Sequence, residues 1–410
     1  MADDINHARA VSPYFVPNKG GSPDDFHGLT DVGADPSVAS EDVNVIGKAK
    51  KCGTDKETPE VTVPLTQLER GEIDTYLTLA NLDSEPAGGF DLLDFNSSLT
   101  DAIYYLKDEF DGAVVSTIWN PKTSVSSITL NIDDPEARIT RDIELSGDDR
   151  RILLGANKFL IYVSNTAPSG TSGNYVIDVS DPAPVEDPNN AGIFILRIDR
   201  TRGTETITLD EPTDYTYNDG SDEITIIDGQ TGDVYNIYYS ASSFGSAGDP
   251  TSVDNDSICF LKAENVTVLI SDQVTELEMD RLSSLTLTAT LNRIDENVIG
   301  SDERVLREIS DTPVVVDLSG RVKNYRGEKA FMNTSADAEL ISSVKLFNDN
   351  VKITIKIYDN AEKNNFLIGY QVDNLSYTDG SFSSTANEFS TMDISAQSDD
   401  VLITSVEGNL

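Results

Sequence analysis

The fold is decided by the stretch Ser284-Leu-Thr-Leu-Thr-Ala-Thr-Leu-Asn-Arg293, which continues through Asn297-Val-Ile-Gly300 to Asp311-Thr-Pro-Val-Val-Val-Asp-Leu318. Leucine and alanine alternate with threonine in its first part, which is the period of two expected of a half-buried strand. Three valines after Pro313 predict a second strand, since proline is common at strand entry. The charged connection Gly300–Thr312 is too long for a tight hairpin, and such a loop is either disordered or bound to something.

The same stretch occurs again near the N-terminus, which indicates an internal duplication. Asn44-Val-Ile-Gly47 matches Asn297-Val-Ile-Gly300 at an offset of 253 (297 − 44). A Thr-Pro pair recurs at an offset of 254 (312 − 58), and Asp142-Ile143 matches Asp393-Ile394 at an offset of 251 (393 − 142). Three matches in the same order at nearly constant offset favour two copies of one fold. The alternative is two unrelated β domains of similar composition.

Composition divides the chain into four segments. Residues 1–40 hold several prolines and glycines around one short apolar run, which predicts an arm that becomes ordered only against another element or subunit. Residues 41–164 form the first repeat and residues 251–410 the second. Residues 165–250 lie between linker-like flanks and hold short apolar runs at about ten-residue spacing, which predicts a small all-β sandwich inserted between the repeats.

Each repeat is predicted to hold one helix among antiparallel strands. In the first repeat the helix is expected at Asn96–Lys107, with a serine cap and one apolar face. The second repeat offers a short helix in the matching place, Ala336–Val344. Alternating runs predict strands at Ala113–Trp119, Val125–Ile132, Ile139–Leu145, Val351–Tyr358, Phe366–Tyr377 and Phe389–Ala396. The predicted fold class is therefore mainly β, with low helix content.

The chain is strongly acidic, yet its strands are well patterned. It has 410 residues, a formal net charge of −41 and 38% hydrophobic residues, so it is not a disordered acidic polymer. Repulsion between carboxylates weakens when the Debye length falls from about 10 Å at 0.1 M salt to about 3 Å at 1 M. The composition is typical of a protein that works in concentrated salt, and an ordinary acidic protein is the alternative. With 30 Lys and Arg against 71 Asp and Glu, a generally basic nucleic-acid-binding surface is excluded.

The sequence contains no constellation for catalysis, a metal or a cofactor. Its two histidines, His7 and His27, both lie in the arm and pair with no positioned nucleophile. Two cysteines, Cys52 and Cys259, make neither a disulfide framework nor a zinc site. Adjacent carboxylates are expected in so acidic a chain and are more often solvated than calcium ligands. We expect no enzyme, no signal peptide and no membrane-spanning helix.

These motifs resemble the tail tube proteins of tailed viruses. The resemblance is carried by residues 284–293, the charged connection and residues 311–318, and in the first repeat by Ile118–Pro121, Ser126–Leu130 and Ile143–Asp148. The insert is similar to the small Ig-like modules that virion proteins carry. The first repeat departs at its start, where Tyr14–Val16 is the best counterpart of Leu285–Leu291.

The resemblance implies a β-sandwich with one helix, whose strands join those of neighbouring subunits into a β-barrel that lines a channel. It implies stacked rings of six fold units, hence three chains when one chain carries two units. Together with the acidic composition, it implies a virus of a halophilic archaeon. The implied partners are other copies of this chain, the tape-measure protein and other tail proteins, while viral DNA passes through without specific binding. The implied location is the virion tail, after synthesis in the host cytoplasm. The alternatives are a distal tail or tube-capping component and an extracellular β-sandwich adhesin.

The two charged connections, Gly47–Thr58 and Gly300–Thr312, are the candidate contacts between subunits or rings, because both are long, charged and placed between equivalent strands. The candidate residues are Gly47, Lys50, Lys51, Asp55, Thr58, Gly300, Asp302, Glu303, Arg304, Arg307 and Thr312. The insert is expected to project from the outer surface and to fold alone. Joining Ser164 to Thr251 would then leave assembly intact.

Overall fold

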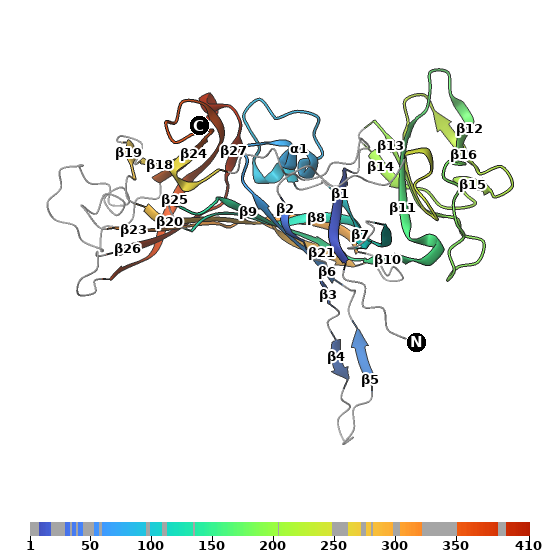
Figure 1. Ribbon diagram of the computed structural model, residues 1–410, viewed down its shortest axis with the longest axis horizontal. Helices are drawn as coiled ribbons and strands as arrows, with labels where there is room; N and C mark the ends of the chain where they lie inside the picture. Colours follow the sequence, from blue (N-terminus) through green and yellow to red (C-terminus); the bar gives the residue numbers. More distant parts are fainter. Residues whose placement is uncertain are drawn as a thin grey trace. The chain divides into compact units, whose positions relative to one another are not determined.

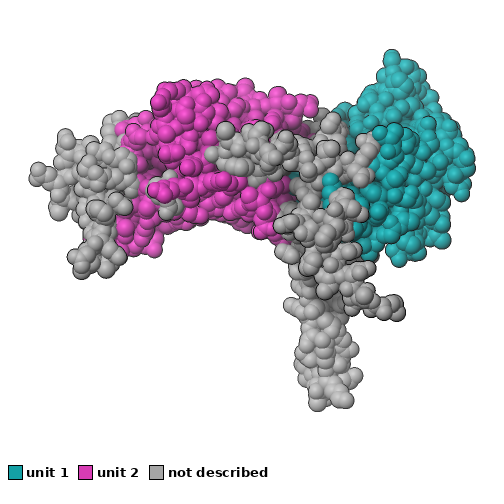
Figure 2. All heavy atoms as spheres, viewed as in Figure 1, with its two compact units in different colours: residues 1–26, 99–123, 147–254 teal, residues 27–98, 124–146, 255–410 magenta. Residues whose placement is uncertain are grey.

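The computed structural model describes residues 8–17, 29–32, 35–37, 40–43, 53–56, 60–95, 99–108, 113–133, 136–203, 205–247, 261–271, 276–279, 282–297, 304–321, 351–383 and 391–410. The chain forms two compact units (Figure 2). Unit 1 comprises residues 1–26, 99–123 and 147–254, and unit 2 comprises residues 27–98, 124–146 and 255–410. The predicted mainly-β fold class is confirmed, and the described residues hold one α-helix, α1 (Asp74–Ala80).

Short 3-10 turns such as η1 (Leu92–Phe95) accompany the strands. The strands are β1 (Ala8–Pro17), β2 (Leu29–Val32), β3 (Asp35–Ser37), β4 (Ser40–Val43), β5 (Gly53–Lys56), β6 (Glu60–Leu68), β7 (Thr100–Asp108), β8 (Val114–Ile132), β9 (Thr140–Gly147), β10 (Arg151–Leu154), β11 (Phe159–Thr166), β12 (Ser172–Asp178), β13 (Ile195–Arg202), β14 (Glu205–Thr208), β15 (Tyr215–Asn218), β16 (Glu223–Gln230), β17 (Val234–Ala241), β18 (Val266–Ser271), β19 (Glu276–Glu278), β20 (Leu282–Thr290), β21 (Asn292–Asn297), β22 (Arg304–Asp311), β23 (Val314–Arg321), β24 (Val351–Tyr358), β25 (Phe366–Ser383), β26 (Thr391–Ser398) and β27 (Leu402–Thr404).

Unit 2 is organised around a sheet whose strand order is β2-β6-β9-β8-β20-β23-β26-β25. The first half of β25 also pairs with β24, which leads on to β18 and β19. All the registered neighbours in this order are antiparallel. Figure 1 shows β20, β23 and β26 running as one sheet, with α1 and β27 on one side of it. Strands of the first repeat and strands of the second thus meet within one sheet, where β8 pairs with β20.

The pairing scheme of the first repeat recurs in the second. In the first, β1 pairs with β7, β7 with β8, β8 with β10 and β9, β9 with β6, and β6 with β2. In the second, β18 pairs with β24, β24 with β25, β25 with β27 and β26, β26 with β23, and β23 with β20. The hairpin β4–β5 precedes β6 as the hairpin β21–β22 precedes β23. The repetition seen in the sequence therefore extends to the order of strand pairing.

A shared β-bulge extends the correspondence to single residues. Between β8 and β9, Val125 pairs with Leu145 and the register then skips Ser126. Between β25 and β26, Tyr377 pairs with Ala396 and the register skips Thr378, at an offset of 252 (378 − 126). Since a bulge inserts one unpaired residue at a defined place, its recurrence at this offset is hard to explain by similar composition alone.

Strands β8 and β25 also bend at equivalent residues. Lys122 has a φ of 51° and Asn374 a φ of 54°, left-handed values that are uncommon outside glycine, at an offset of 252 (374 − 122). Up to Thr123 β8 pairs with β7 and β10, and from Ser124 onward it pairs with β9 and β20. The two strands predicted at Ala113–Trp119 and Val125–Ile132 are therefore one 19-residue strand with a bend between them.

The helix predicted at Asn96–Lys107 is wrong, because this segment forms β7. Thr100, Ala102, Ile103 and Tyr104 are all buried, so the apolar spacing that suits one helix face belongs here to a strand covered on both sides. The β-branched and aromatic run Ile103-Tyr104-Tyr105 favours a strand, and this preference outweighs the cap signal. The helix predicted at Ala336–Val344 lies outside the described residues.

Residues 1–40, predicted to become ordered only against another element or subunit, supply β1, which pairs with β7, and β2 and β3, which pair with β6. Strand β2 pairs with β6 as β20 pairs with β23, and both pairings skip one residue, Thr30 and Ser283, at an offset of 253 (283 − 30). The counterpart of Leu285–Leu291 is therefore β2 with β3, while Tyr14–Val16 in β1 corresponds to β18. Two strands of only three and four residues give too short a pattern to be recognised.

Unit 1 combines the insert with strands of the first repeat. The insert forms two sheets, β11-β17-β13-β14 and β12-β16-β15, and its first strand begins at Phe159, before the expected start at residue 165. One hydrophobic core contains residues of both sheets together with Ile103 of β7 and Trp119 of β8. The Trp119 ring stacks on Tyr238 of β17, with 5.4 Å between centroids. Joining Ser164 to Thr251 would uncover Trp119, which packs in this shared core. The excision is therefore no longer expected to leave assembly intact.

Candidate assembly surface

The sheet of unit 2 has one buried face and one polar face. Along β20, Leu285, Leu287 and Ala289 are buried while the threonines between them are partly exposed. The same alternation follows β6, β9, β23 and β26. An antiparallel sheet with one covered face shows this pattern, because successive side chains point to opposite faces.

The polar face is rich in carboxylates and hydroxyls. Its carboxylates come from both repeats, namely Asp31, Glu60, Asp142, Glu144, Asp317, Asp379 and Asp393. Among the side chains described on this face there is no lysine or arginine. Asp142 accepts hydrogen bonds from Thr66 Oγ1 at 2.7 Å and from Asn131 Nδ2 at 2.6 Å, and its counterpart Asp393 accepts one from Ser381 Oγ at 2.8 Å. Neutral donors thus hold the carboxylates in place without cancelling their charge.

The junction between the repeats lies in the middle of this sheet. Leu287 of β20 pairs with Leu130 of β8, and both side chains are buried on the covered face. One residue further on, Thr288 pairs with Thr129 on the polar face, and their Oγ1 atoms are 3.3 Å apart. A ladder of six registered pairs makes this junction a regular part of the sheet, comparable with the pairings inside each repeat.

A buried polar cluster joins the two repeats behind the covered face. Glu69, which follows β6, is fully buried and accepts hydrogen bonds from the Arg70 and Gly71 amides and from the Tyr370 hydroxyl of β25 at 3.0 Å. Arg141 of β9 lies 3.8 Å from its carboxylate. Burial lowers the pKa of Arg141, but the Glu69 charge together with Tyr76 and Tyr370 more than offsets this, so the guanidinium stays protonated. Burial and the same carboxylate raise the pKa of Tyr370 well above its ordinary value.

Unit 1 has a comparable cluster around Asp101 of β7. Its carboxylate accepts hydrogen bonds from Trp119 Nε1 at 3.2 Å and the Tyr238 hydroxyl at 2.6 Å, and it pairs with Arg197 of β13. Arg197 also pairs with Asp199 at 2.7 Å, and its guanidinium lies 4.1 Å from the centre of the Tyr238 ring. The cluster ties the insert to β7 and β8 by buried charge as well as by apolar contact.

Three of the residues predicted as contacts lie on two β-hairpins rather than on loops. Asp55 lies in β5, which pairs with β4, while Arg304 and Arg307 lie in β22, which pairs with β21. Thr312 follows β22, and its hydroxyl donates a hydrogen bond to the Asp399 carbonyl. The other predicted contacts lie outside the described residues: Gly47, Lys50, Lys51, Thr58, Gly300, Asp302 and Glu303. These strands could not be predicted from the sequence, because their charged residues show only a weak alternation of apolar and polar side chains.

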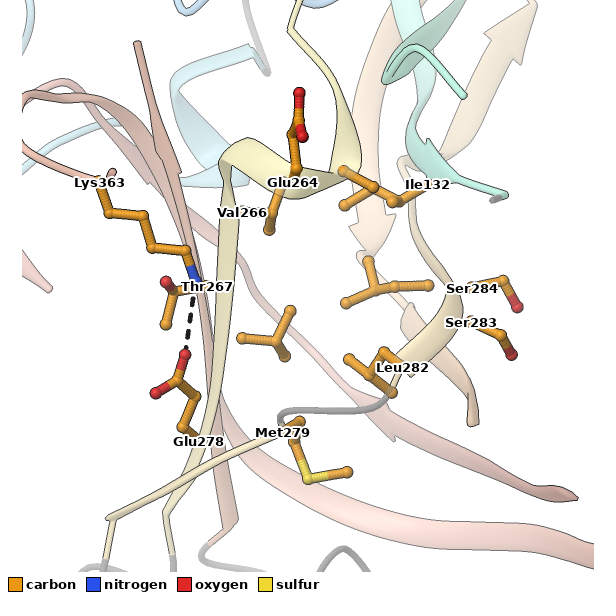
Figure 3. Close-up of a pocket in the computed structure, with 13 residues that line it drawn as sticks. Ile132, Glu264, Val266, Thr267, Glu278, Met279, Leu282, Ser283, Ser284 and Lys363 are labelled. Atoms are coloured by element: carbon orange, nitrogen blue, oxygen red, sulfur yellow. Dashed lines mark hydrogen bonds and ion pairs between the residues drawn. The ribbon is translucent and has the colours of Figure 1, made fainter. Parts of the chain in front are cut away.

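A small open pocket of about 320 Å³ lies beside the start of β20 (Figure 3). Leu282, Met279 and Ile132 line it with apolar surface, and Lys363 points at Glu278 across its rim at 3.5 Å. No group of His, Cys, Asp or Glu suited to a metal occurs among the described residues. No helix in the described part of the chain is long and apolar enough to cross a membrane.

Comparison with known proteins gives distant structural likenesses. No family model and no curated protein matches the chain. The chain is similar to the tube-terminating cap of the anti-feeding prophage, with 15% identity, a TM-score of 0.27, and coverage of 39% of this chain and 98% of that one. A chain of the sheath–tube complex of the extracellular contractile injection system PVC in its extended state gives 15% identity, a TM-score of 0.27, and coverage of 38% and 100%. A chain of the anti-feeding prophage baseplate gives 12% identity, a TM-score of 0.26, and coverage of 35% of this chain and 92% of that one. At these TM-scores the likeness carries no inference about function.

The density of carboxylates makes stability depend on salt. We expect the melting temperature to rise by several degrees between about 0.1 M and 2 M KCl, because screening removes repulsion in a chain of net charge −41. Scanning calorimetry over this range measures it, with an uncharged osmolyte as control for general exclusion effects. A melting temperature that stays flat contradicts adaptation to concentrated salt.

Proposed function

We propose that this chain is a structural subunit of a tailed-virus tail tube, in which three copies close a ring and rings stack around a channel for DNA. One observation carries the proposal: two copies of one strand-pairing scheme meet edge to edge, at β8 and β20, in a sheet with one polar face. A chain that already joins two wedges of a sheet needs only further copies of itself to continue the wall. The sequence motifs that resemble those of tail tube proteins agree with this role.

The polar face is the proposed lining of the channel. Its carboxylates and hydroxyls, with no described lysine or arginine side chain among them, offer no counter-charge to phosphate. Double-stranded DNA carries one negative charge per roughly 1.7 Å of axis, so basic side chains on the wall would bind it and slow its passage. The location that follows is the virion tail, with the tape-measure and other tail proteins as partners.

Cryo-electron microscopy of the purified chain tests this function. We expect rings of three chains with six sheet wedges, stacked into tubes, and three copies of the insert around each ring. Six inserts per ring would mean that only one repeat of each chain enters the wall. Single rings that never stack indicate a tube-capping component, and monomers under all salt conditions contradict the proposal.

The two hairpins β4–β5 and β21–β22 are the proposed contacts between rings or subunits. Both precede the equivalent strands β6 and β23, and neither strand of either hairpin pairs with the main sheet in the described residues. Deleting residues 302–307 from the second hairpin is expected to leave a folded chain that does not polymerise. Far-UV circular dichroism checks folding and sedimentation checks assembly. Normal tubes from this variant would show that the hairpin is only a solvated connection.

A further inference from the structure

We propose that the two open edges of the unit 2 sheet pair with one another between copies of the chain, β3 of one copy beside the C-terminal half of β25 of the next. The proposal rests on the proposed function, since it names the surface that would close the ring. Among the described residues, β3 pairs only with β6, and residues 379–383 of β25 pair only with β26. Each of these segments therefore offers one further edge to a strand.

The internal junction provides the register for this pairing. There β20 and β8 are antiparallel, with Thr288 opposite Thr129 and Thr290 opposite Ser127. Strand β3 is the counterpart of this part of β20. Asp35 pairs with Thr62 of β6 as Thr288 pairs with Val315 of β23, at an offset of 253 on both strands (288 − 35 and 315 − 62).

The C-terminal half of β25 is likewise the counterpart of β8 beyond its bulge. Ser381 pairs with Asp393 of β26 as Thr129 pairs with Asp142 of β9, at offsets of 252 (381 − 129) and 251 (393 − 142). In the internal junction Thr288 lies opposite Thr129. Replacing each of these residues by its counterpart in the other repeat places Asp35 of one copy opposite Ser381 of the next. The same operation places Ser37 opposite Asp379.

The β25 edge carries an exposed apolar side chain where the internal junction has a buried one. Phe382 is 56% exposed, whereas its counterpart Leu130 is fully buried opposite Leu287. An exposed aromatic ring on an open strand edge is costly unless another chain covers it. The Gly380 amide, whose counterpart Ile128 pairs with Ala289, donates instead to the neighbouring Asp379 carboxylate at 2.8 Å. A local acceptor thus occupies the place of a strand partner.

Strand β3 differs from β20 in one respect that affects the strength of the pairing between copies. Pro36 stands at the position of Ala289 and has no amide hydrogen to donate. Proline is tolerated where a strand's donor would face an open edge, so Pro36 fits the described sheet. The junction between copies would hold one hydrogen bond fewer than the junction within the chain, which favours a separable subunit over a permanent one.

The pairing is heterologous, because β3 and β25 are different edges, so it adds copies head to tail. Its main competitor is isologous pairing of two β25 edges around a twofold axis, which would bury both Phe382 rings but stop at a dimer. The two arrangements place different residues opposite one another. Ser381 meets Asp35 in the first, and two β25 strands meet in the second.

Disulfide trapping in the full-length chain distinguishes these arrangements. All variants carry Cys52→Ser and Cys259→Ser, which remove the two native cysteines. The test variant is Asp35→Cys with Ser381→Cys, and the out-of-register control is Asp35→Cys with Ser383→Cys. Thr129→Cys with Thr288→Cys serves as the positive control, because this internal pair has the same register and must crosslink within one chain. Directly opposed strand residues have Cα atoms about 4.5–5.5 Å apart, within the range that a disulfide spans.

We expect oxidised Asp35→Cys/Ser381→Cys protein to give covalent dimers and trimers on non-reducing gels, at least about tenfold more than the out-of-register control. A mixture of the two single variants should give dimers only. Crosslinking of Ser381→Cys alone to itself overturns the head-to-tail pairing. Rings in the microscope without crosslinks overturn this inference but leave the tube function standing. Crosslinked trimers that never stack support the edge pairing and contradict the tube, and the absence of both rings and crosslinks overturns both.

Discussion

Replacing Asp101 by asparagine is expected to destabilise unit 1 by about 3–5 kcal/mol, because it leaves the Arg197 guanidinium without one of its two buried counter-charges. The carboxylate is 1% exposed and bonds to Trp119, Tyr238 and Arg197 at once. An amide of the same shape can accept at one oxygen only, and its NH₂ group would face Arg197 or Trp119 as a second donor. The loss therefore comes from an unpaired buried charge and from donors that face each other.

Trp119 provides the measurement, since it is the only tryptophan in the chain and lies inside this cluster. Urea unfolding followed by its fluorescence should give a much lower midpoint for the Asp101→Asn variant. The control is Asp149→Asn, which removes an exposed ion pair with Arg151 in the same unit and should cost no more than about 1 kcal/mol. Equal effects of the two substitutions would show that the Asp101 cluster does not hold the insert to β7 and β8.

Replacing Glu69 by glutamine is expected to cost unit 2 a similar amount, about 3–5 kcal/mol, because Arg141 would remain buried and charged without its carboxylate. Glu69 also accepts from the Tyr370 hydroxyl, so the substitution weakens a link between β25 of the second repeat and the segment that follows β6 of the first. Tyr370→Phe removes that link together with the hydrogen bond between the Tyr370 and Tyr76 hydroxyls, and its expected cost is about 1–2 kcal/mol.

Glu72→Gln is a matched control for this substitution, three residues away in the same unit. Glu72 pairs with Arg70 at 3.0 Å, but its side chain is 43% exposed, so its loss should cost no more than about 1 kcal/mol. Far-UV circular dichroism during urea unfolding compares the three variants with the original chain. A Glu69→Gln variant as stable as Glu72→Gln would mean that the polar cluster contributes nothing net to unit 2.

Strands that have one apolar and one polar face could be predicted from the sequence. The Leu-Thr pattern of β20 and the valines of β23 were recognised because each strand keeps a single covered face along its whole length. β24 lies where the alternation of Val351–Tyr358 places it. Asp142 and Asp393, which belong to one of the three sequence matches that indicate the repeat, occupy equivalent positions on the polar face.

Elements covered on both faces, or held by pairing alone, could not be predicted. β7 is buried on both sides, and its apolar run matches a helix face as well as it matches a strand. β8 contains a proline at its bend, and proline usually ends a strand. The hairpins β4–β5 and β21–β22 consist of charged residues with no apolar alternation, so only their backbone pairing defines them. The clusters around Glu69 and Asp101 join residues far apart in the chain, which short-range patterns do not reveal.

The β8–β20 junction has a consequence for how the chain is made. Ile132 and its partner Leu285 are separated by 153 residues (285 − 132), so β8 has no neighbour on that side until this length has been synthesised. At roughly 5–20 residues per second, translation needs roughly 8–30 s to supply β20. During this interval the apolar edge formed by Ile128 and Leu130 is open to other nascent chains. Expression at reduced translation speed should therefore lower the soluble yield unless a chaperone shields the β8 edge.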